Sequence, residues 1–94
     1  MNYPSEIGYI GSSKYRQLVM VFLATHGANI PTNIAKGTGI RTNHISKTLK
    51  ELSNKGVIKC LNDEARKGRL YAITDKGVKV LEEMRWKYGK RTNH

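Results

Sequence analysis

The sequence predicts a small α+β domain that is mostly helical, with one two-stranded β-hairpin and a C-terminal helix. Three observations predict this fold class. A tight glycine turn, Gly37–Ile40, joins two helical stretches. The second stretch, 41–55, has apolar residues at helical spacing and ends before Gly56. Two short β-forming stretches then flank a basic loop. A chain of 94 residues has room for one such domain with a modest core.

The first twelve residues carry the weakest structural signal. Pro4, Gly8 and Gly11 interrupt them and argue against a long helix. Their apolar side chains indicate a segment that packs on protein: Tyr3, Ile7, Tyr9 and Ile10. No Lys or Arg precedes Lys14, so a basic arm for a minor groove is not expected. We therefore divide the chain into an N-terminal segment (1–12), a folded domain (13–88) and a basic tail (89–94).

The first long helix is predicted from a cap at Ser12 or Ser13 to about His26, with Gly27 as its stop. Its apolar residues form more than one stripe: Tyr15, Leu18, Val19 and Phe22, with Met20, Val21 and Leu23 beside them. Such a helix is buried on more than one side. Either it is central to the core, or it also meets a second subunit.

Two helices then flank the glycine turn. Pro31 fits the first position of the earlier one, in which Ile34 and Ala35 point inward. Gly37 weakens that helix by roughly 1 kcal/mol relative to Ala, so the helix depends on tertiary packing. Thr42 is the predicted cap of the later helix. One side of that helix is apolar (Ile45, Leu49, Leu52), and the other is polar (Asn43, Lys47, Lys50 and Asn54, with Ser46 nearby).

The predicted hairpin has strands at 57–61 and 70–73, joined by the loop 62–69. The loop is basic near its end, with Arg66, Lys67 and Arg69 around Gly68, while Asp63 and Glu64 dilute the charge at its base. Thr74 or Asp75 is the predicted cap of a last helix. That helix carries Val78, Leu81 and Met84, and a continuation would carry Trp86 and Tyr88.

The net charge favours a polyanionic partner. Seventeen Lys and Arg against seven Asp and Glu give +10, a field that attracts nucleic acid first, and membrane surface or acidic protein less well. The single cysteine, Cys60, cannot form an internal disulfide, which fits a cytoplasmic protein. The apolar run 18–24 is far too short to cross a bilayer, so no membrane association is expected.

The candidate nucleic-acid contacts lie on the helix after the turn and on the basic loop. A helix of about fourteen residues is a rod of roughly 20 Å, long enough to lie in a major groove. Asn can pair with adenine, and Lys can donate to guanine or phosphate. The candidates are Arg41, Thr42, Asn43, His44, Ser46, Lys47, Lys50, Arg66, Lys67 and Arg69. The alternative interpretation is a solvated helix face and a polar hairpin without a ligand.

Catalysis finds no support in the sequence. Asp63 and Glu64 lie together in a loop, and Glu82 and Glu83 point to different sides of a helix, so neither pair is arranged for catalysis. The sequence also contains no glycine-rich phosphate loop of known spacing. His26, His44 and His94 have no metal-ligand spacing with Cys60. Cys60 itself is expected to be a small buried filler of its strand. We therefore expect a protein that is not an enzyme, with no catalytic residue, no cofactor and no metal.

Two phrases resemble a known family. Residues 42–58, TNHISKTLKELSNKGVI, look like the recognition helix and first wing strand of MarR-like winged helix-turn-helix regulators. Residues 67–77, KGRLYAITDKG, look like the second wing strand and the start of the following helix. The similarity covers roughly residues 14–86, and the size is similar to that of small archaeal and archaeal-virus winged-helix proteins. The resemblance implies DNA contacts by Thr42, Asn43, His44, Ser46 and Lys47, wing contacts by Lys67 and Arg69, and dimerisation through terminal helices. The family's ligand cleft has little room here, so a small-molecule effector is not expected.

The resulting hypothesis is a homodimeric, sequence-specific double-stranded DNA-binding protein that regulates transcription. Its recognition helix (42–55) would enter the major groove, and its wing (62–69) would lie on the backbone or in the minor groove. The first alternative is a protein-interaction subunit of a transcription or replication assembly. The second is binding of single-stranded nucleic acid or RNA, which would need an exposed aromatic platform that the five tyrosines do not outline.

Overall fold

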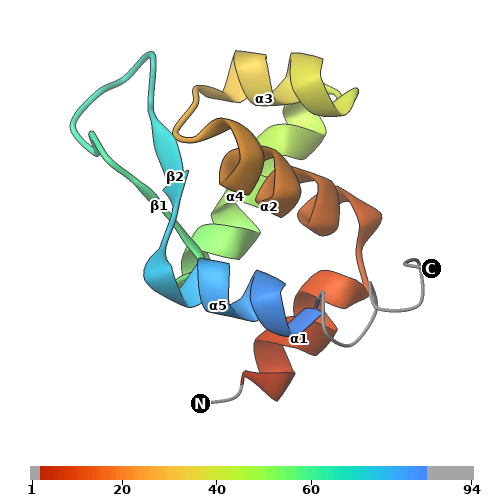
Figure 1. The fold of residues 1–94 in the computed structure, drawn as a ribbon. Helices are drawn as coiled ribbons and strands as arrows, with labels where there is room; N and C mark the ends of the chain where they lie inside the picture. The colour runs from red at the N-terminus through yellow and green to blue at the C-terminus, as the bar shows by residue number, and fades with distance from the viewer. Residues whose placement is uncertain (1–2, 85–94) are drawn as a thin grey trace.

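The computed structural model describes residues 3–84, which form five helices and one two-stranded hairpin (Figure 1). In chain order these elements are α1 (Pro4–Gly11), α2 (Lys14–His26), α3 (Pro31–Thr38), α4 (Thr42–Asn54), β1 (Ile58–Cys60), β2 (Tyr71–Ile73) and α5 (Asp75–Met84). This order confirms the predicted fold class. The predicted positions of Trp86 and Tyr88 and the basic tail lie outside the described residues.

Helix α2 lies at the centre of the domain and contacts α1, α3, α4, α5 and β2. Its ends are where the sequence predicts them. The Ser13 side chain accepts a hydrogen bond from the Arg16 amide at 3.3 Å, and Gly27 has φ of 82° at the other end. Val19, Met20 and Leu23 are at most 1% exposed. Met20 and Leu23, which could have faced a second subunit, therefore belong to the domain's own core.

Helix α1 is the main element that the sequence did not predict. The residues that interrupt the segment fit inside a short helix, because Pro4 occupies its first turn and Gly11 is its last residue. Ile7 and Ile10 lie three residues apart and are both buried. The expectation that this segment packs on protein is thus confirmed, through contacts of α1 with α2 and α5.

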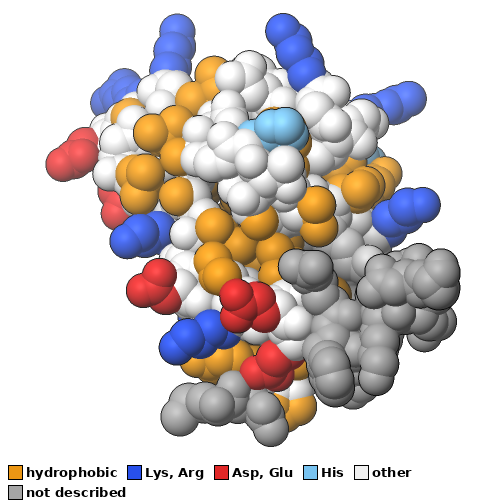
Figure 2. All heavy atoms as spheres, in the orientation of Figure 1, with side chains coloured by type: hydrophobic (Ala, Val, Ile, Leu, Met, Phe, Trp, Pro, Cys, Tyr) orange, Lys and Arg blue, Asp and Glu red, His pale blue; other side chains and the backbone are white. Residues whose placement is uncertain are grey.

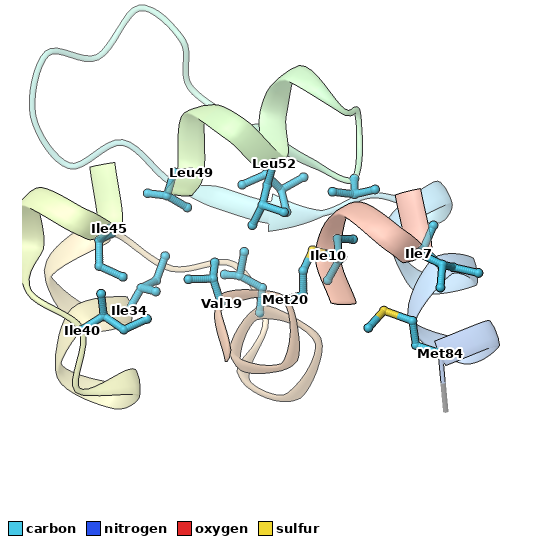
Figure 3. Packing of buried hydrophobic residues seen from close by; sticks show 14 residues of the cluster. Ile7, Ile10, Val19, Met20, Ile34, Ile40, Ile45, Leu49, Leu52 and Met84 are labelled. Carbon is cyan, nitrogen blue, oxygen red and sulfur yellow. The ribbon is translucent and has the colours of Figure 1, made fainter. Parts of the chain in front are cut away.

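One continuous core joins the helix-turn-helix to the terminal helices. Figure 3 shows Ile34, Ile40 and Ile45 at one end of this core, and Ile7 and Met84 at the other. Leu49 and Leu52 of α4 are at most 2% exposed, as the spacing predicts. Because its whole apolar side is embedded, α4 is held rigidly and presents its opposite side to solvent.

The hairpin is antiparallel, with Ile58 paired to Ile73 and Cys60 paired to Tyr71. Its strands are shorter than predicted, at three residues each. A further bridge was not predicted: Asn29 and Tyr71 exchange two backbone hydrogen bonds of 2.9 Å. The loop before α3 therefore extends the sheet and fixes the base of the hairpin to the helices.

Helix α5 begins with Thr74 as its cap, one of the two predicted residues. The Thr74 hydroxyl accepts from the Gly77 amide at 3.0 Å and donates to the Gly56 carbonyl at 2.7 Å. Of the apolar residues of α5, Val78 is 39% exposed, whereas Val80, which the sequence analysis does not single out, is fully buried. No helix of residues 3–84 is both long enough and apolar enough to cross a membrane.

Gly77 of α5 packs directly against the backbone of Val57, with no room for a side chain between them. A Cβ at this position would overlap the Val57 carbonyl oxygen and crowd the Ile73 side chain at 2.7 Å. We expect Gly77→Ala to destabilise the domain by about 1–3 kcal/mol through overpacking, despite the better helix propensity of Ala. Gly8→Ala in α1 is the control, because nothing lies within 4 Å of its Cβ. Urea unfolding of the two variants measures the difference, and equal stabilities would contradict the packing argument.

Candidate nucleic-acid interface

The N-terminus of α4 is set by the glycine turn before it. Gly39 adopts a left-handed conformation with φ of 77°, and Ile40 is buried beside it. Arg41, not Thr42, occupies the cap position, with extended backbone and no side-chain cap bond. Thr42 is the first helical residue, so α4 begins one residue earlier than a cap at Thr42 predicts. The first amides of α4 therefore have no side-chain acceptor and can donate hydrogen bonds to an anion.

The outward side of α4 carries the polar residues that the sequence places there. Asn43, Ser46, Lys47, Lys50 and Asn54 are exposed. The opposite side is closed by Thr48 as well as the apolar residues, and the Thr48 hydroxyl donates to the His44 carbonyl at 2.8 Å. The exposed face is thus a strip of amides, hydroxyls and lysines on a rigid support.

Glu51, the one acid of α4, lies one turn after Lys47, at the edge of this strip. Its Oε1 accepts from Arg16 Nε of α2 at 3.2 Å. The same guanidinium donates to the Tyr9 carbonyl at 2.8 Å and lies over the Tyr9 ring at 3.7 Å. The charge of Glu51 beside the strip is therefore offset by the Arg16 guanidinium of the domain itself.

The C-terminus of α4 is held by residues of α1 and α5. Lys76 Nζ donates to the Lys55 carbonyl at 2.9 Å and forms a salt bridge of 2.9 Å with Glu6. A cation at this end is favourable for the helix dipole. The hydrogen bond from Lys76 lowers the pKa of Glu6 below its ordinary value of 4.5, which favours the ionised carboxylate of this salt bridge. Helix α1, missed by the sequence interpretation, therefore supports the candidate interface from behind.

His44 and Tyr15 form one edge of the interface. Their ring centroids are 5.3 Å apart, and Tyr15 is 42% exposed. The sequence placed Tyr15 on the apolar side of its helix. It was missed as a candidate because only its contact with His44, nearly thirty positions later, shows that it lies beside α4.

The hairpin loop is held together by two of its own side chains. Asn62 accepts from the Leu70 amide at 2.8 Å and donates to the Gly68 carbonyl at 3.2 Å. Arg69 donates from Nε to the Ala65 carbonyl at 2.8 Å and from Nη2 to the Asp63 carbonyl at 2.9 Å. Arg69, predicted only as a DNA contact, therefore also stabilises the loop through these two hydrogen bonds.

Arg66 and Lys67 differ from Arg69 in being free of such bonds. Both are exposed, and no salt bridge within residues 3–84 involves either. They remain the loop's available cations. Asn62, which gave no sequence signal beyond being a turn former, is a structural residue of this loop.

The charges are distributed unevenly. Figure 2 shows most Lys and Arg side chains projecting from the upper part of the molecule, around α3 and the hairpin, and most Asp and Glu side chains lower down. Four of the seven acids belong to α1 and α5: Glu6, Asp75, Glu82 and Glu83. The exposed cations of α4 and of the loop, Lys47, Lys50, Arg66 and Lys67, lie outside these two acidic helices. Within the described part of the chain, no group of three or more His, Cys, Asp or Glu is placed to hold a metal ion.

Cys60 is half-buried, so the expectation of a fully buried filler is wrong. Its thiol lies 3.4 Å from Asn62 Oδ1, the atom that also accepts from the Leu70 amide. The side chain faces the space between β1 and α4 rather than the core.

Comparison with known proteins agrees with this arrangement. A family model described as winged helix-turn-helix matches residues 14–89. No curated protein sequence matches the chain. Similar solved structures include the MarR family regulator NMB1585 from Neisseria meningitidis (TM-score 0.69, 21% identity, 95% of this chain and 68% of that chain). The YusO protein from Bacillus subtilis is also similar (TM-score 0.75, 20% identity, 95% and 66%).

A third similar structure is BpsR from Bordetella bronchiseptica, whose DNA binding is described as regulated by 6-hydroxynicotinic acid (TM-score 0.70, 21% identity, 77% and 51%). At these identities the likeness concerns the fold. The chain spans about half of BpsR and about two thirds of the other two. The resemblance to MarR-like proteins, drawn from the sequence, is confirmed at the level of fold.

Proposed function

Because the chain belongs to the winged helix-turn-helix family, we propose that it binds double-stranded DNA in a sequence-specific manner and regulates transcription. The observation that carries the proposal is the exposed strip of α4. The only acid of α4, Glu51, is paired with Arg16 of α2, and the lysines and amides of the strip are exposed to solvent. Amides and lysines are the side chains that read adenine and guanine edges in a major groove.

The structure supports a division of roles. Asn43, Ser46 and Lys47 belong to the first half of α4 and are the proposed base contacts, with His44 at the edge. Arg41, Thr42 and the free amides of the helix start are proposed to contact phosphate. Arg66 and Lys67 on the loop, which we now call the wing, are proposed to follow the backbone or enter the minor groove.

We also propose that the protein acts as a homodimer. Two apolar residues, Val21 of α2 and Val78 of α5, are 52% and 39% exposed, on helices that contact each other. They support an interface on α2 and α5. The larger apolar excess that the sequence indicated is reduced, because Met20, Leu23 and Met84 are buried in the domain itself.

Selection of duplexes from a random pool tests the function directly. We expect enriched sites with two inverted half-sites about 34 Å apart, because a two-fold dimer presents two recognition helices to successive major grooves. No small molecule is added, since we propose that none is required. Sedimentation equilibrium of the free protein at micromolar concentration checks the dimer. A pool without enrichment would overturn sequence-specific binding, and a monomer bound to a single half-site would overturn only the dimer.

A further inference from the structure

A groove of about 550 Å³ separates the C-terminal half of α4 from the hairpin. Lys50, Ser53 and Asn54 line it from α4, and Lys59, Cys60 and Arg69 line it from the hairpin. Lys50 and Lys59 both line the groove, one from each wall, and both residues are exposed. The groove therefore has a lysine on each wall. The proposed function uses Ser46 and Lys50 of its α4 wall and leaves the hairpin wall at Lys59 and Cys60 unassigned.

The wall on the hairpin side is built to keep its shape. The guanidinium of Arg69 is fixed by its bonds to the Asp63 and Ala65 carbonyls, and Cys60 is paired with Tyr71 in the sheet. Tyr71 is in turn bonded to Asn29 of the helical domain. The opposite wall is α4, which is embedded along its apolar side. The separation of the walls is thus set by the fold rather than by a flexible loop.

The position of the groove determines what would pass through it. If α4 lies in a major groove and the wing reaches the neighbouring minor groove, one sugar-phosphate strand separates the two. That strand must cross the protein between α4 and the hairpin, where the groove lies.

We propose that this groove holds one sugar-phosphate strand of the duplex, with Lys50 and Lys59 contacting its phosphates from opposite walls. The inference rests on the proposed DNA binding and adds a site to it. Ser53 and Asn54 supply neutral donors on the α4 side. Contacts of this kind fix the angle of the protein on the duplex and carry no sequence information themselves.

Asp63 places a negative charge at the groove, which would weaken the binding of a phosphate there. Its side chain is exposed and also lines the groove, while its backbone carbonyl is the group that Arg69 binds. A phosphate strand in the groove would be repelled by this carboxylate. Replacing the carboxylate by an amide leaves the bond to Arg69 intact, so the effect on binding can be measured without dismantling the wing.

Charge-neutralising variants test the site. Lys59→Gln is expected to weaken binding to selected and random duplexes by the same factor and to lower the slope of log affinity against log salt by about 0.9. Lys79→Gln on α5 removes an equal charge outside the groove and should change neither quantity. Asp63→Asn should tighten binding to both duplexes, more than Glu82→Gln on α5 does. If each groove variant behaves like its α5 control while the duplex still binds, the groove does not hold DNA.

Cys60 provides an independent readout, because it is the chain's only cysteine and lines the groove. Its reaction with methyl methanethiosulfonate, followed by intact mass, is expected to slow severalfold when the protein is saturated with duplex. Salt high enough to dissociate the duplex should restore the free rate. An unchanged rate in the bound state overturns the groove site but leaves the proposed function standing. Failure of any duplex to bind, measured by fluorescence anisotropy, overturns the proposed function itself.

Discussion

Raising the salt concentration from about 50 to about 200 mM is expected to weaken duplex binding by ~10³- to 10⁵-fold, if six to ten phosphates are contacted. The physical reason is counterion release, since each cation that neutralises a phosphate frees a condensed ion. The chain has the charge for this, at +10. The structure also separates the available cations into the start of α4, its exposed strip and the wing tip, which lets one duplex engage several at once.

Fluorescence anisotropy with a labelled duplex at a series of salt concentrations measures the effect. Arg66→Gln and Lys67→Gln should each lower the slope by about 0.9, because both side chains are exposed and have no salt-bridge partner among the described residues. A nearly flat dependence would remove DNA as the partner. It would favour the alternative in which the domain is a protein-interaction subunit of a larger assembly.

The helices around the glycine turn could be predicted because their signals are local. Ser13, Gly27 and Pro31 each mark an end through the geometry of their own backbone. The spacing of the apolar residues in α4 predicts which side of the helix is buried, even though the elements that pack against it are unknown at that stage. These two kinds of signal were enough for the fold class and for the polar strip on α4.

Helix α1 could not be predicted because its stability is not local. Eight residues with Pro4, Gly8 and Gly11 form a poor helix alone. The helix is held by burial of Ile7 and Ile10 and by the salt bridge from Glu6 to Lys76, seventy positions later. The β-bridge between Asn29 and Tyr71 could not be predicted for the same reason, because no sequence pattern pairs a loop residue with a distant strand.

The chemistry of the candidate site shows the same limit. Exposure of the α4 residues follows from helical spacing and was predicted correctly. The partners of charged groups were not. Spacing alone does not show that Glu51 is paired with Arg16, or that Arg69 is bonded to its own loop. Both facts change the roles: the charge of Glu51 is offset by Arg16, and Arg69 becomes a wing scaffold as well as a charge.

Substitution of the exposed residues on α4 should reduce discrimination between DNA sequences more than it reduces binding in general. Asn43→Ala or Lys47→Ala is expected to cost about 1–3 kcal/mol on the selected site and much less on random duplex. The reason is that amide and ammonium groups on this strip would bond to base edges, which differ between sequences. Both positions are exposed and lie opposite the core, so the fold should be unaffected.

The wing provides the contrast that makes this result specific. Arg69→Ala is expected to weaken selected and random duplexes comparably, because it removes a charge and releases the loop that carries Arg66 and Lys67. Arg69→Lys keeps the charge but loses the paired bonds to the Asp63 and Ala65 carbonyls. It should therefore recover only part of the affinity. Anisotropy on both duplexes separates the two classes. If the variants at Asn43 and Lys47 keep the full preference for the selected site, sequence is read elsewhere than on this face of α4.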